Sequence, residues 1–355
     1  MQQKKISLAL LFGGRSAEHE VSITSARSIY DNLDRNKYRI SCLYVNKDGR
    51  WQNVASPHFP VSELERDDSA SFLPWNAEGL EKTLSADVYF PIMHGPFGED
   101  GTIQGLFELA DTPYVGAGVL ASAAGMDKAV AKTLFQARGL PVGKYRIVYQ
   151  KDWTHRAQAL LEEIRSEILL PSFVKPANMG SSVGITKVKK IDDIEAALNT
   201  AFLYDRKVLV EEGILGREIE CSVLGNEDLK TSIPGEVIPH AEFYDYQDKY
   251  ITGKTNFKVP APLTPDVIQE IQRMAMEAFR SIEGSGMARV DFFLQDKTGR
   301  IFLNEINTIP GFTKISMYPK LWAFSGLPFP DLLDELIALA LEKHASKSFR
   351  RAPSP

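Results

Sequence analysis

Two acidic residues and an asparagine near the C-terminus have the types and spacing of a divalent-cation site. Arg289 and Asp291 are two positions apart, as are Glu305 and Asn307, so each pair shares one face of a β-strand. A turn between the strands sets Asp291 opposite Asn304 or Glu305. Carboxylate and amide oxygens suit Mg²⁺ or Mn²⁺, with phosphate oxygens completing the octahedral shell. A ladder of ion pairs on a solvated hairpin is the alternative that the hairpin alone leaves open.

Two further segments could bind the parts of a nucleotide. Residues 177–184 form a Gly/Ser loop between two strand-like stretches, and Lys175 precedes the loop. Backbone N–H groups and hydroxyls of such a loop can cover phosphates, although similar loops occur without ligands. Glu211 follows the strand-like residues 208–210 and could accept the hydroxyls of a ribose. Acids exposed at a strand end are the more common explanation of that second pattern.

The N-terminal elements that would position these groups alternate between strand and helix. A helical stretch at 21–33 separates the first two of three strand-like runs, at 7–12, 38–45 and 88–92. This alternation predicts a parallel sheet with helices on its faces. Ligands of such sheets collect at the carboxyl ends of the strands, where residues 13–20 and 94–101 lie.

The rest of the chain predicts a mixture of helices and strands. A helix should begin at the N-cap Asp127 and end at Gly139, with Lys128 and Lys132 on one face. Residues 242–258 carry many aromatic and charged side chains without a period, which predicts a long loop. Further helices are expected from Thr264 and over 331–343, and strands over 172–175, 185–190, 208–210, 218–224, 287–294 and 301–306.

Composition limits the classes of protein that fit. A chain of 355 residues with 44% hydrophobic and 25% charged residues predicts two or three globular domains. The net charge of −5 argues against nucleic acid as the main partner. Two cysteines provide no disulfide framework, and no apolar run approaches about 18 residues, so no membrane span is expected. The short apolar run 6–12 predicts a buried strand, and a cytoplasmic location follows.

Seven motifs follow one another in order along the chain. They are Gly13-Gly14-x-Ser16-x-Glu18-x-Glu20-Val21-Ser22, His94-Gly95-x-x-Gly98-Glu99-Asp100-Gly101, Met126-Asp127-Lys128, Lys175-Pro176-x5-Ser182-Val183-Gly184, Tyr244-Asp245-Tyr246-x-x-Lys249-Tyr250, Arg289-x-Asp291 and Asn304-Glu305-x-Asn307-Thr308-x-Pro310-Gly311. Together these motifs resemble the D-alanine–D-alanine ligase family of ATP-grasp enzymes, and the resemblance extends from about residue 7 to residue 341.

The resemblance implies an α/β (α+β) fold of three domains. Residues 1–116 would form a parallel-sheet, Rossmann-like domain that binds the first D-alanine. Residues 117–211 and 212–355 would form the two lobes of an ATP-grasp fold. The second lobe would hold the metal site and a mobile aromatic loop at about 242–258. The family also implies a homodimer through the N-terminal domain.

The implied reaction joins two D-alanine molecules to D-alanyl-D-alanine for peptidoglycan precursor synthesis. ATP phosphorylates the first carboxylate, the amine of the second D-alanine attacks the acyl phosphate, and ADP and phosphate are released. Two Mg²⁺ or Mn²⁺ ions would be bound by Asp291, Glu305 and Asn307, with Glu305 bridging them. ATP would contact Lys128, Lys175, Ser181, Ser182 and Lys249 at its phosphates and Glu211 and Glu218 at adenosine.

The resemblance also assigns substrate-binding and catalytic residues. Glu18 would bind the ammonium of the first D-alanine, although an acid at a helix N-terminus also has a structural explanation. His94 would lie near the first D-alanine, and Ser316 would bind the carboxylate of the second. The oxyanion of the tetrahedral intermediate would be stabilised by Arg289 and the Gly311 N–H. A hydrogen-bonded chain of Glu18, Ser181 and Tyr250 would link the three domains.

Three alternatives remain at this point. A D-alanine–D-lactate ligase of the same family typically lacks the tyrosine found here at Tyr250, so its presence favours an amine as the second nucleophile. A non-catalytic nucleotide-binding protein is a second alternative, although all the expected cation ligands and basic residues are present. A dinucleotide oxidoreductase is the third, although Gly13-Gly14 is not part of a full Gly-x-Gly-x-x-Gly motif. The acceptor of the amine's proton stays open.

Overall fold

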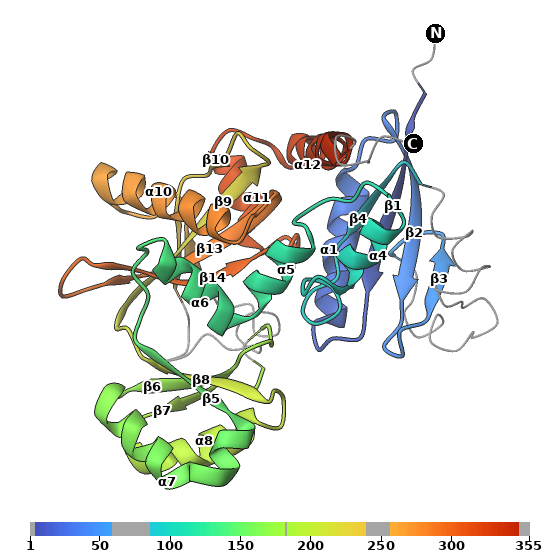
Figure 1. Ribbon diagram of the computed structural model, residues 1–355. Helices are drawn as coiled ribbons and strands as arrows, with labels where there is room; N and C mark the ends of the chain where they lie inside the picture. Colours follow the sequence, from blue (N-terminus) through green and yellow to red (C-terminus); the bar gives the residue numbers. More distant parts are fainter. Residues whose placement is uncertain (1–3, 59–85, 182, 239–255, 348–355) are drawn as a thin grey trace, which may run out of the picture.

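The computed structural model describes residues 4–58, 86–181, 183–238 and 256–347. These residues form a mixed α/β structure with three separate β-sheets (Figure 1). Within those ranges every helix is too short or too polar to cross a membrane. The predicted residues Ser182, Lys249 and Tyr250 lie outside the described part of the chain, as does most of the predicted aromatic loop.

The first sheet has the strand order β3-β2-β1-β4. Strand β1 runs parallel to β2 and β4, as predicted, whereas the unpredicted β3 pairs antiparallel with β2. The bounds are β1 Ile6–Gly13, β2 Tyr38–Val45, β3 Trp51–Val54 and β4 Val88–Pro91, with helices α1 His19–Asn32, α4 Thr102–Leu109 and α5 Val119–Met126.

The second sheet is antiparallel throughout, in the order β5-β8-β6-β7. Alternate residues of its strands point to opposite faces, so Val174, Val208 and Val210 pack against α7 and α8. Lys175 and Glu211 therefore point away from those helices. The bounds are β5 Tyr145–Tyr149, β6 Ser172–Pro176, β7 Thr186–Val188, β8 Lys207–Glu212, α6 Lys128–Ala137, α7 Gln150–Glu167 and α8 Ile194–Ala201.

The third sheet has the order β12-β11-β9-β13-β14, and β10 also pairs with β9. Ile219, Cys221 and Val290 lie on the face that packs against α10, whose Pro265 at N1 begins the helix as predicted. Residues 256–258 form a strand rather than the end of the predicted loop. The bounds are β9 Gly216–Gly225, β10 Lys230–Thr231, β11 Gly235–Ile238, β12 Asn256–Lys258, β13 Gly286–Gln295, β14 Ile301–Asn307 and α10 Pro265–Ser281.

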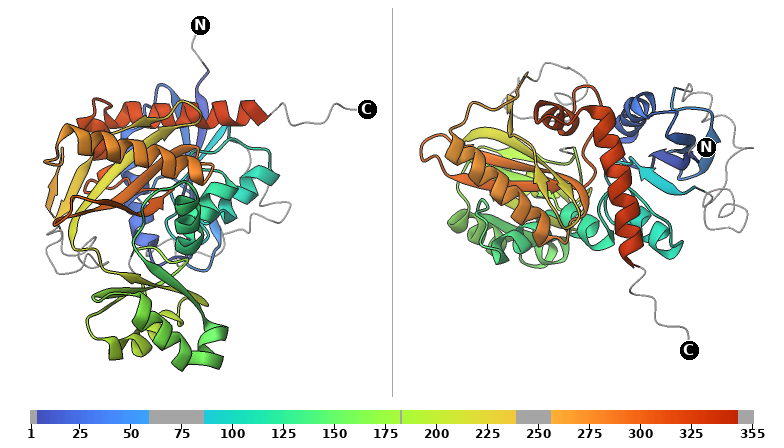
Figure 2. Two further views of the ribbon diagram at one scale, coloured as in Figure 1. Left: turned by 60° about the vertical axis from the view of Figure 1, so that its left-hand side comes forward. Right: turned by 90° about the horizontal axis from the view of Figure 1, so that it is seen from above.

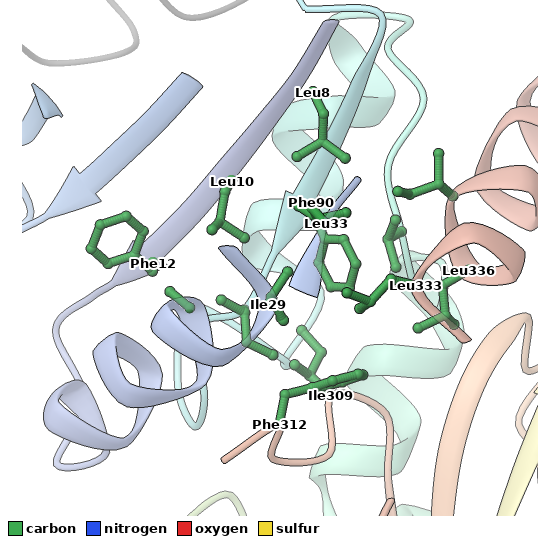
Figure 3. Close-up of a cluster of buried hydrophobic side chains, with 14 of the residues drawn as sticks. Leu8, Leu10, Phe12, Ile29, Leu33, Phe90, Ile309, Phe312, Leu333 and Leu336 are labelled. Carbon is green, nitrogen blue, oxygen red and sulfur yellow. The ribbon is translucent and has the colours of Figure 1, made fainter. Parts of the chain in front are cut away.

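The last two helices, α11 (Met317–Phe324) and α12 (Phe329–Ser346), connect the first sheet to the third. Helix α12 contacts α1 and β4 on one side and β13 on the other, and it lies between the two sheets when seen from above (Figure 2, right). Leu333 and Leu336 of α12 pack with Leu8 and Phe90 of the first sheet and with the turn that contains Phe312 (Figure 3). This apolar cluster fixes the turn after β14 against the first sheet.

Candidate active site

The metal-ligand candidates lie on the β13–β14 hairpin as predicted. Asp291 pairs with Glu305, and Arg289 pairs with Asn307. The register shifts between Asp291 and Phe292, which leaves Asn304 as an extra residue in β14. The sequence left Asn304 and Glu305 as possible partners of Asp291, and the structure pairs Asp291 with Glu305.

Asp291 is held by neighbouring polar groups. Arg289 donates from Nε to Oδ1 and from a terminal nitrogen to Oδ2, both at 2.7 Å, and Asn307 Nδ2 donates to Oδ2 at 3.0 Å. Arg289 Nε also lies 3.2 Å from Glu220 Oε2. Burial opposes the charge on Arg289, but Asp291 and Glu220 outweigh it and raise its pKa well above the ordinary value. The guanidinium is therefore a permanent cation in this site.

The donor set fits a cation that binds together with phosphate. Asp291, Glu305 and Asn307 supply two carboxylates and an amide, all with the hard oxygen atoms that Mg²⁺ and Mn²⁺ prefer. Among the described residues, no cluster of three or more acidic, histidine or cysteine side chains forms a metal site by itself. Further oxygen ligands would have to come from water or a bound phosphate, as Mg²⁺ sites in nucleotide enzymes require.

A cleft of about 430 Å³ lies between the second and third sheets. Lys175 Nζ donates to Glu211 Oε2 at 2.7 Å, and Lys132 Nζ lies 3.3 Å from Glu211 Oε1. Burial opposes ionisation of Glu211, but the two lysines together lower its pKa to about 2. The lining also includes the predicted residues Glu218, Asp291 and Glu305. The cleft therefore combines a lysine pair around Glu211 with the metal-ligand candidates.

A smaller cavity of about 90 Å³ adjoins this cleft. Glu305 and Ile185 line both spaces, so the two share a wall. Lys128 lines the smaller cavity, where Nζ donates to the Met179 carbonyl at 2.7 Å and lies 3.8 Å from Glu305 Oε2. Its remaining predicted residues are Glu18, His94, Ser181, Arg289, Asn307 and Gly311.

Glu18 and Ser181 meet in this cavity, although 163 positions separate them. The Ser181 hydroxyl donates to the Glu18 carboxylate, and Glu18 makes no side-chain cap of α1. Glu18 is the N-cap residue of α1, but its carboxylate bonds to Ser181 and not to the backbone of the helix. Gly95 and Gly180 lie close to this carboxylate. A Cβ on Gly95 would fall 2.9 Å from Glu18 Oε2, and a Cβ on Gly180 would fall 2.5 Å from the same atom. The two glycines leave room for the buried carboxylate.

His94 connects the first sheet to the turn after β14. Its Nδ1 lies 3.0 Å from the Ile309 carbonyl and its Nε2 lies 3.2 Å from Ser25 Oγ. Ser25 Oγ also accepts the Phe312 N–H at 3.2 Å. A neutral imidazole protonated at Nδ1 satisfies all three contacts. Burial lowers the pKa of His94, although Glu18 acts in the opposite direction.

This lowered pKa predicts a pH dependence of stability. The unfolded chain binds a proton at His94 near pH 6.5, whereas the buried ring resists protonation, so the contribution of His94 to the free energy of unfolding should fall as pH drops below about 6.5. The slope from this group is at most about 1.4 kcal/mol per pH unit. The difference between the free energies of unfolding at pH 5.5 and pH 7.5, measured with urea, should be smaller in His94→Gln than in the wild type. Equal differences in the two proteins would contradict the assignment.

Gly311 and Ser316 lie beside each other at the end of the turn. A Cβ on Gly311 would fall 2.6 Å from Ser316 Oγ, and that oxygen accepts the Thr313 N–H at 3.0 Å. Gly311 lines the small cavity, whereas Ser316 lines neither space. The structure thus has Ser316 beside Gly311, and its contact with substrate stays a prediction.

Three buried polar residues of the site had no predicted role. Lys132 shares a helix face with Lys128, and this spacing was visible in the sequence. Burial and the Glu18 charge raise the pKa of Glu99 to about 8, although the Gly95 N–H donates to it at 3.0 Å. Glu220 lies between the buried apolar residues Ile219 and Cys221 on β9. This alternation in the sequence was the signal that could have placed Glu220 on the opposite, cleft-facing side of the strand.

A cleft between two sheets that is lined by lysines and by the carboxylates of Asp291 and Glu305, with a small polar cavity beside it, is the arrangement of an ATP-grasp ligase. Family models described as "D-ala D-ala ligase N-terminus" and "D-ala D-ala ligase C-terminus" match residues 7–117 and 134–338. The chain belongs to the D-alanine–D-alanine ligase family, whose members depend on ATP.

Similar proteins support this membership over nearly the full length. The D-alanine–D-alanine ligase of Thermoanaerobacter sp. is 48% identical, with 98% of this chain and 99% of that protein covered. The D-alanine–D-alanine ligase of Heliobacterium modesticaldum is 46% identical, with 97% and 96% covered. The solved ligase of Coxiella burnetii has a TM-score of 0.83 at 39% identity, with 98% and 97% covered. The VanG D-Ala:D-Ser ligase of Enterococcus faecalis has a TM-score of 0.80 at 34% identity, with 95% and 100% covered.

Proposed function

We propose that this chain joins two D-alanine molecules in an ATP-dependent reaction that forms D-alanyl-D-alanine, ADP and phosphate. The observation that carries the proposal is the wall shared by the two spaces, where Glu305 faces both the nucleotide-sized cleft and the small cavity. A γ-phosphate at this wall would lie beside a substrate carboxylate in the cavity. The product would serve peptidoglycan precursor synthesis.

The nucleotide would lie in the larger cleft. Lys175 and Lys128 would bind its phosphates, together with Ser181, Ser182 and Lys249, while Glu211 and Glu218 would contact adenosine. Asp291, Glu305 and Asn307 would hold two Mg²⁺ or Mn²⁺ ions, which supply positive charge between the γ-phosphate and the attacking carboxylate. The lysines add positive charge beside the phosphates, so positioning and electrostatics would account for most of the rate.

The first D-alanine would lie in the smaller cavity. Glu18 would bind its ammonium, and His94 would shape the cavity through its hold on the Ile309–Phe312 turn. The substrate carboxylate attacks the γ-phosphorus, and the acyl phosphate then keeps one carboxylate oxygen between carbon and phosphorus. The second D-alanine would have its carboxylate at Ser316. Its amine attacks the carbonyl carbon of the acyl phosphate.

The tetrahedral intermediate carries a negative oxygen until phosphate leaves. Arg289 lines the cavity as a permanent cation, and the Gly311 N–H belongs to the turn at its edge. These two donors would stabilise the oxyanion. Tyr250, from outside the described residues, would complete the hydrogen-bonded chain with Glu18 and Ser181 when the aromatic loop closes over the intermediate and excludes water.

Phosphate release with different substrates tests the proposal. With ATP and Mg²⁺, we expect rapid phosphate release with D-alanine and little with L-alanine. D-Lactate or D-serine offered with D-alanine should compete poorly as the second substrate, which separates this function from those of D-lactate and D-serine ligases. Phosphate release that is independent of any amino acid, or absent altogether, would contradict the proposal.

Gly180→Ala should weaken D-alanine binding without unfolding the protein. The three atoms nearest to the added methyl group all belong to the carboxylate end of Glu18, so we expect that carboxylate to shift and the fold to persist. We expect the KM for D-alanine to rise at least about tenfold, equivalent to about 1.4 kcal/mol. Gly105→Ala is the matched control, because nothing lies within 4 Å of its added methyl on α4. Steady-state kinetics with an unchanged KM in Gly180→Ala would count against Glu18 as the ammonium ligand.

The domain division and assembly are also proposed. Residues 1–116, 117–211 and 212–355 would be the three domains, each built around one of the sheets, although α12 packs against the first sheet as well as the third. A homodimer would form through the N-terminal domain. Because the reaction consumes ATP, the cytoplasm is its expected location.

Exposed apolar side chains on α4 and α5 support the dimer. Leu109 is 90% and Leu120 65% exposed, and the two helices are in contact. Light scattering should give twice the chain mass of 39.6 kDa for the wild type and the single mass for a Leu109→Glu, Leu120→Glu double variant. A variant that stays dimeric would exclude this surface.

A further inference from the structure

Three carboxylates lie in one row across the third sheet. Asp291 of β13 pairs with Glu305 of β14 on one side and with Glu220 of β9 on the other. Directly paired residues share a face of a sheet, and all three side chains line the nucleotide cleft. Glu220 is nevertheless buried, with 7% exposure. A buried acid beside two candidate metal ligands needs an explanation, because burial of a charge costs free energy unless it is paired.

Arg289 stands between two of these carboxylates. It makes a bidentate pair with Asp291 at 2.7 Å and approaches Glu220 at 3.2 Å. Both oxygens of Asp291 thus accept hydrogen bonds from the guanidinium. A divalent ion on the same carboxylate would lie within a few ångströms of that guanidinium, and the two cations would repel each other. Metal binding at Asp291 therefore requires Arg289 to change its partner.

We propose that Glu220 is a positioning residue that holds the Arg289 guanidinium when Asp291 binds metal. Glu220 is already in ion-pair contact with Arg289, so the change needs a small rotation and leaves no buried charge unpaired. Arg289 then remains beside the small cavity that it lines, and Asp291 is free for the ion. This inference rests on the proposed roles of Asp291 and Arg289.

A second possibility is that Glu220 is itself a metal ligand, since it belongs to the same row. The two roles differ in their dependence on Arg289. A positioning residue acts only by drawing Arg289 away from Asp291, whereas a ligand contacts the ion whether or not the arginine is present. Metal affinity in the presence and absence of Arg289 therefore separates the two.

The experiment measures Mn²⁺ binding by electron paramagnetic resonance, with a non-hydrolysable ATP analogue present. In Glu220→Gln, the Mn²⁺ dissociation constant should rise about tenfold. This is the lower end of the loss of metal affinity seen when a residue that supports a metal ligand is replaced. In an Arg289→Met background the same substitution should change affinity less than about twofold, because Asp291 is then already free. Arg289→Gln replaces that background if circular dichroism shows that Arg289→Met is unfolded.

Glu236→Gln is the matched control. Glu236 is a buried carboxylate of the same cleft that pairs with a different arginine, Arg217, at 2.8 Å. Its substitution should leave Mn²⁺ affinity unchanged. Unchanged affinity in Glu220→Gln, or equal weakening with and without Arg289, would overturn the inference, the latter in favour of a direct ligand. Failure of the wild type to bind Mn²⁺ would instead refute the proposed function itself.

Discussion

Arg289→Met is expected to lower kcat by about 10²–10³-fold, the usual effect of removing one donor to a developing oxyanion. The guanidinium is partly buried, permanently charged and in the wall of the small cavity, and methionine retains most of its volume without its charge. Because Asp291 also loses its bidentate partner, Mn²⁺ affinity should stay the same or increase. The loss should therefore appear in turnover rather than in metal binding.

Rapid-quench kinetics and Mn²⁺ titration of the same preparation test this prediction. Acyl phosphate formation should persist in Arg289→Met, while its conversion to dipeptide slows. Arg289→Lys serves as the conservative comparison, since it keeps a positive charge but loses the planar fork of donors. If Arg289→Met retained wild-type turnover, or lost metal affinity in proportion to its rate, the proposed role at the oxyanion would be wrong.

Asp291→Asn, in contrast to Arg289→Met, should weaken metal binding. Removing one carboxylate charge from the row weakens the divalent-ion site, so the Mg²⁺ concentration for half-maximal rate should rise at least about tenfold. Phosphoryl transfer should slow more than D-alanine binding weakens, because Asp291 lines the nucleotide cleft and not the smaller cavity. The substitution keeps side-chain volume, so packing is preserved.

A titration of rate against Mg²⁺ at saturating ATP and D-alanine measures this effect. High Mg²⁺ should restore part of the rate of Asp291→Asn but none of the rate of Arg289→Met. Equal rates of wild type and Asp291→Asn at low Mg²⁺ would rule out Asp291 as a ligand. The two variants together thus separate metal binding from oxyanion stabilisation.

Much of the hairpin was predictable because strand periodicity is strict. The spacing predicted that Arg289 shares a strand face with Asp291, and Glu305 with Asn307, and the structure pairs the four residues across the hairpin. The Asp127 cap was equally local, and its side chain accepts from the N–H groups of Ala129 and Val130. Local patterns of this kind need no knowledge of distant neighbours.

Features that depend on distant neighbours could not be predicted in the same way. The pairing of β9 with β13 puts Glu220 beside Asp291, and only the three-dimensional register shows this. The choice of Glu305 over Asn304 depends on one bulge in β14. The family resemblance implied a hydrogen bond between Glu18 and Ser181, which the structure has, but no local pattern of the sequence brings these two residues together.

The most direct test of the reaction follows oxygen atoms from substrate to phosphate. D-Alanine labelled with ¹⁸O in its carboxylate is incubated with ATP, Mg²⁺ and the protein, and the released phosphate is examined by mass spectrometry. If the carboxylate attacks the γ-phosphorus and the amine later expels phosphate, each phosphate carries one ¹⁸O atom and the dipeptide retains one in its new peptide carbonyl. Dipeptide formation with unlabelled phosphate would show that no acyl phosphate forms and would contradict the account.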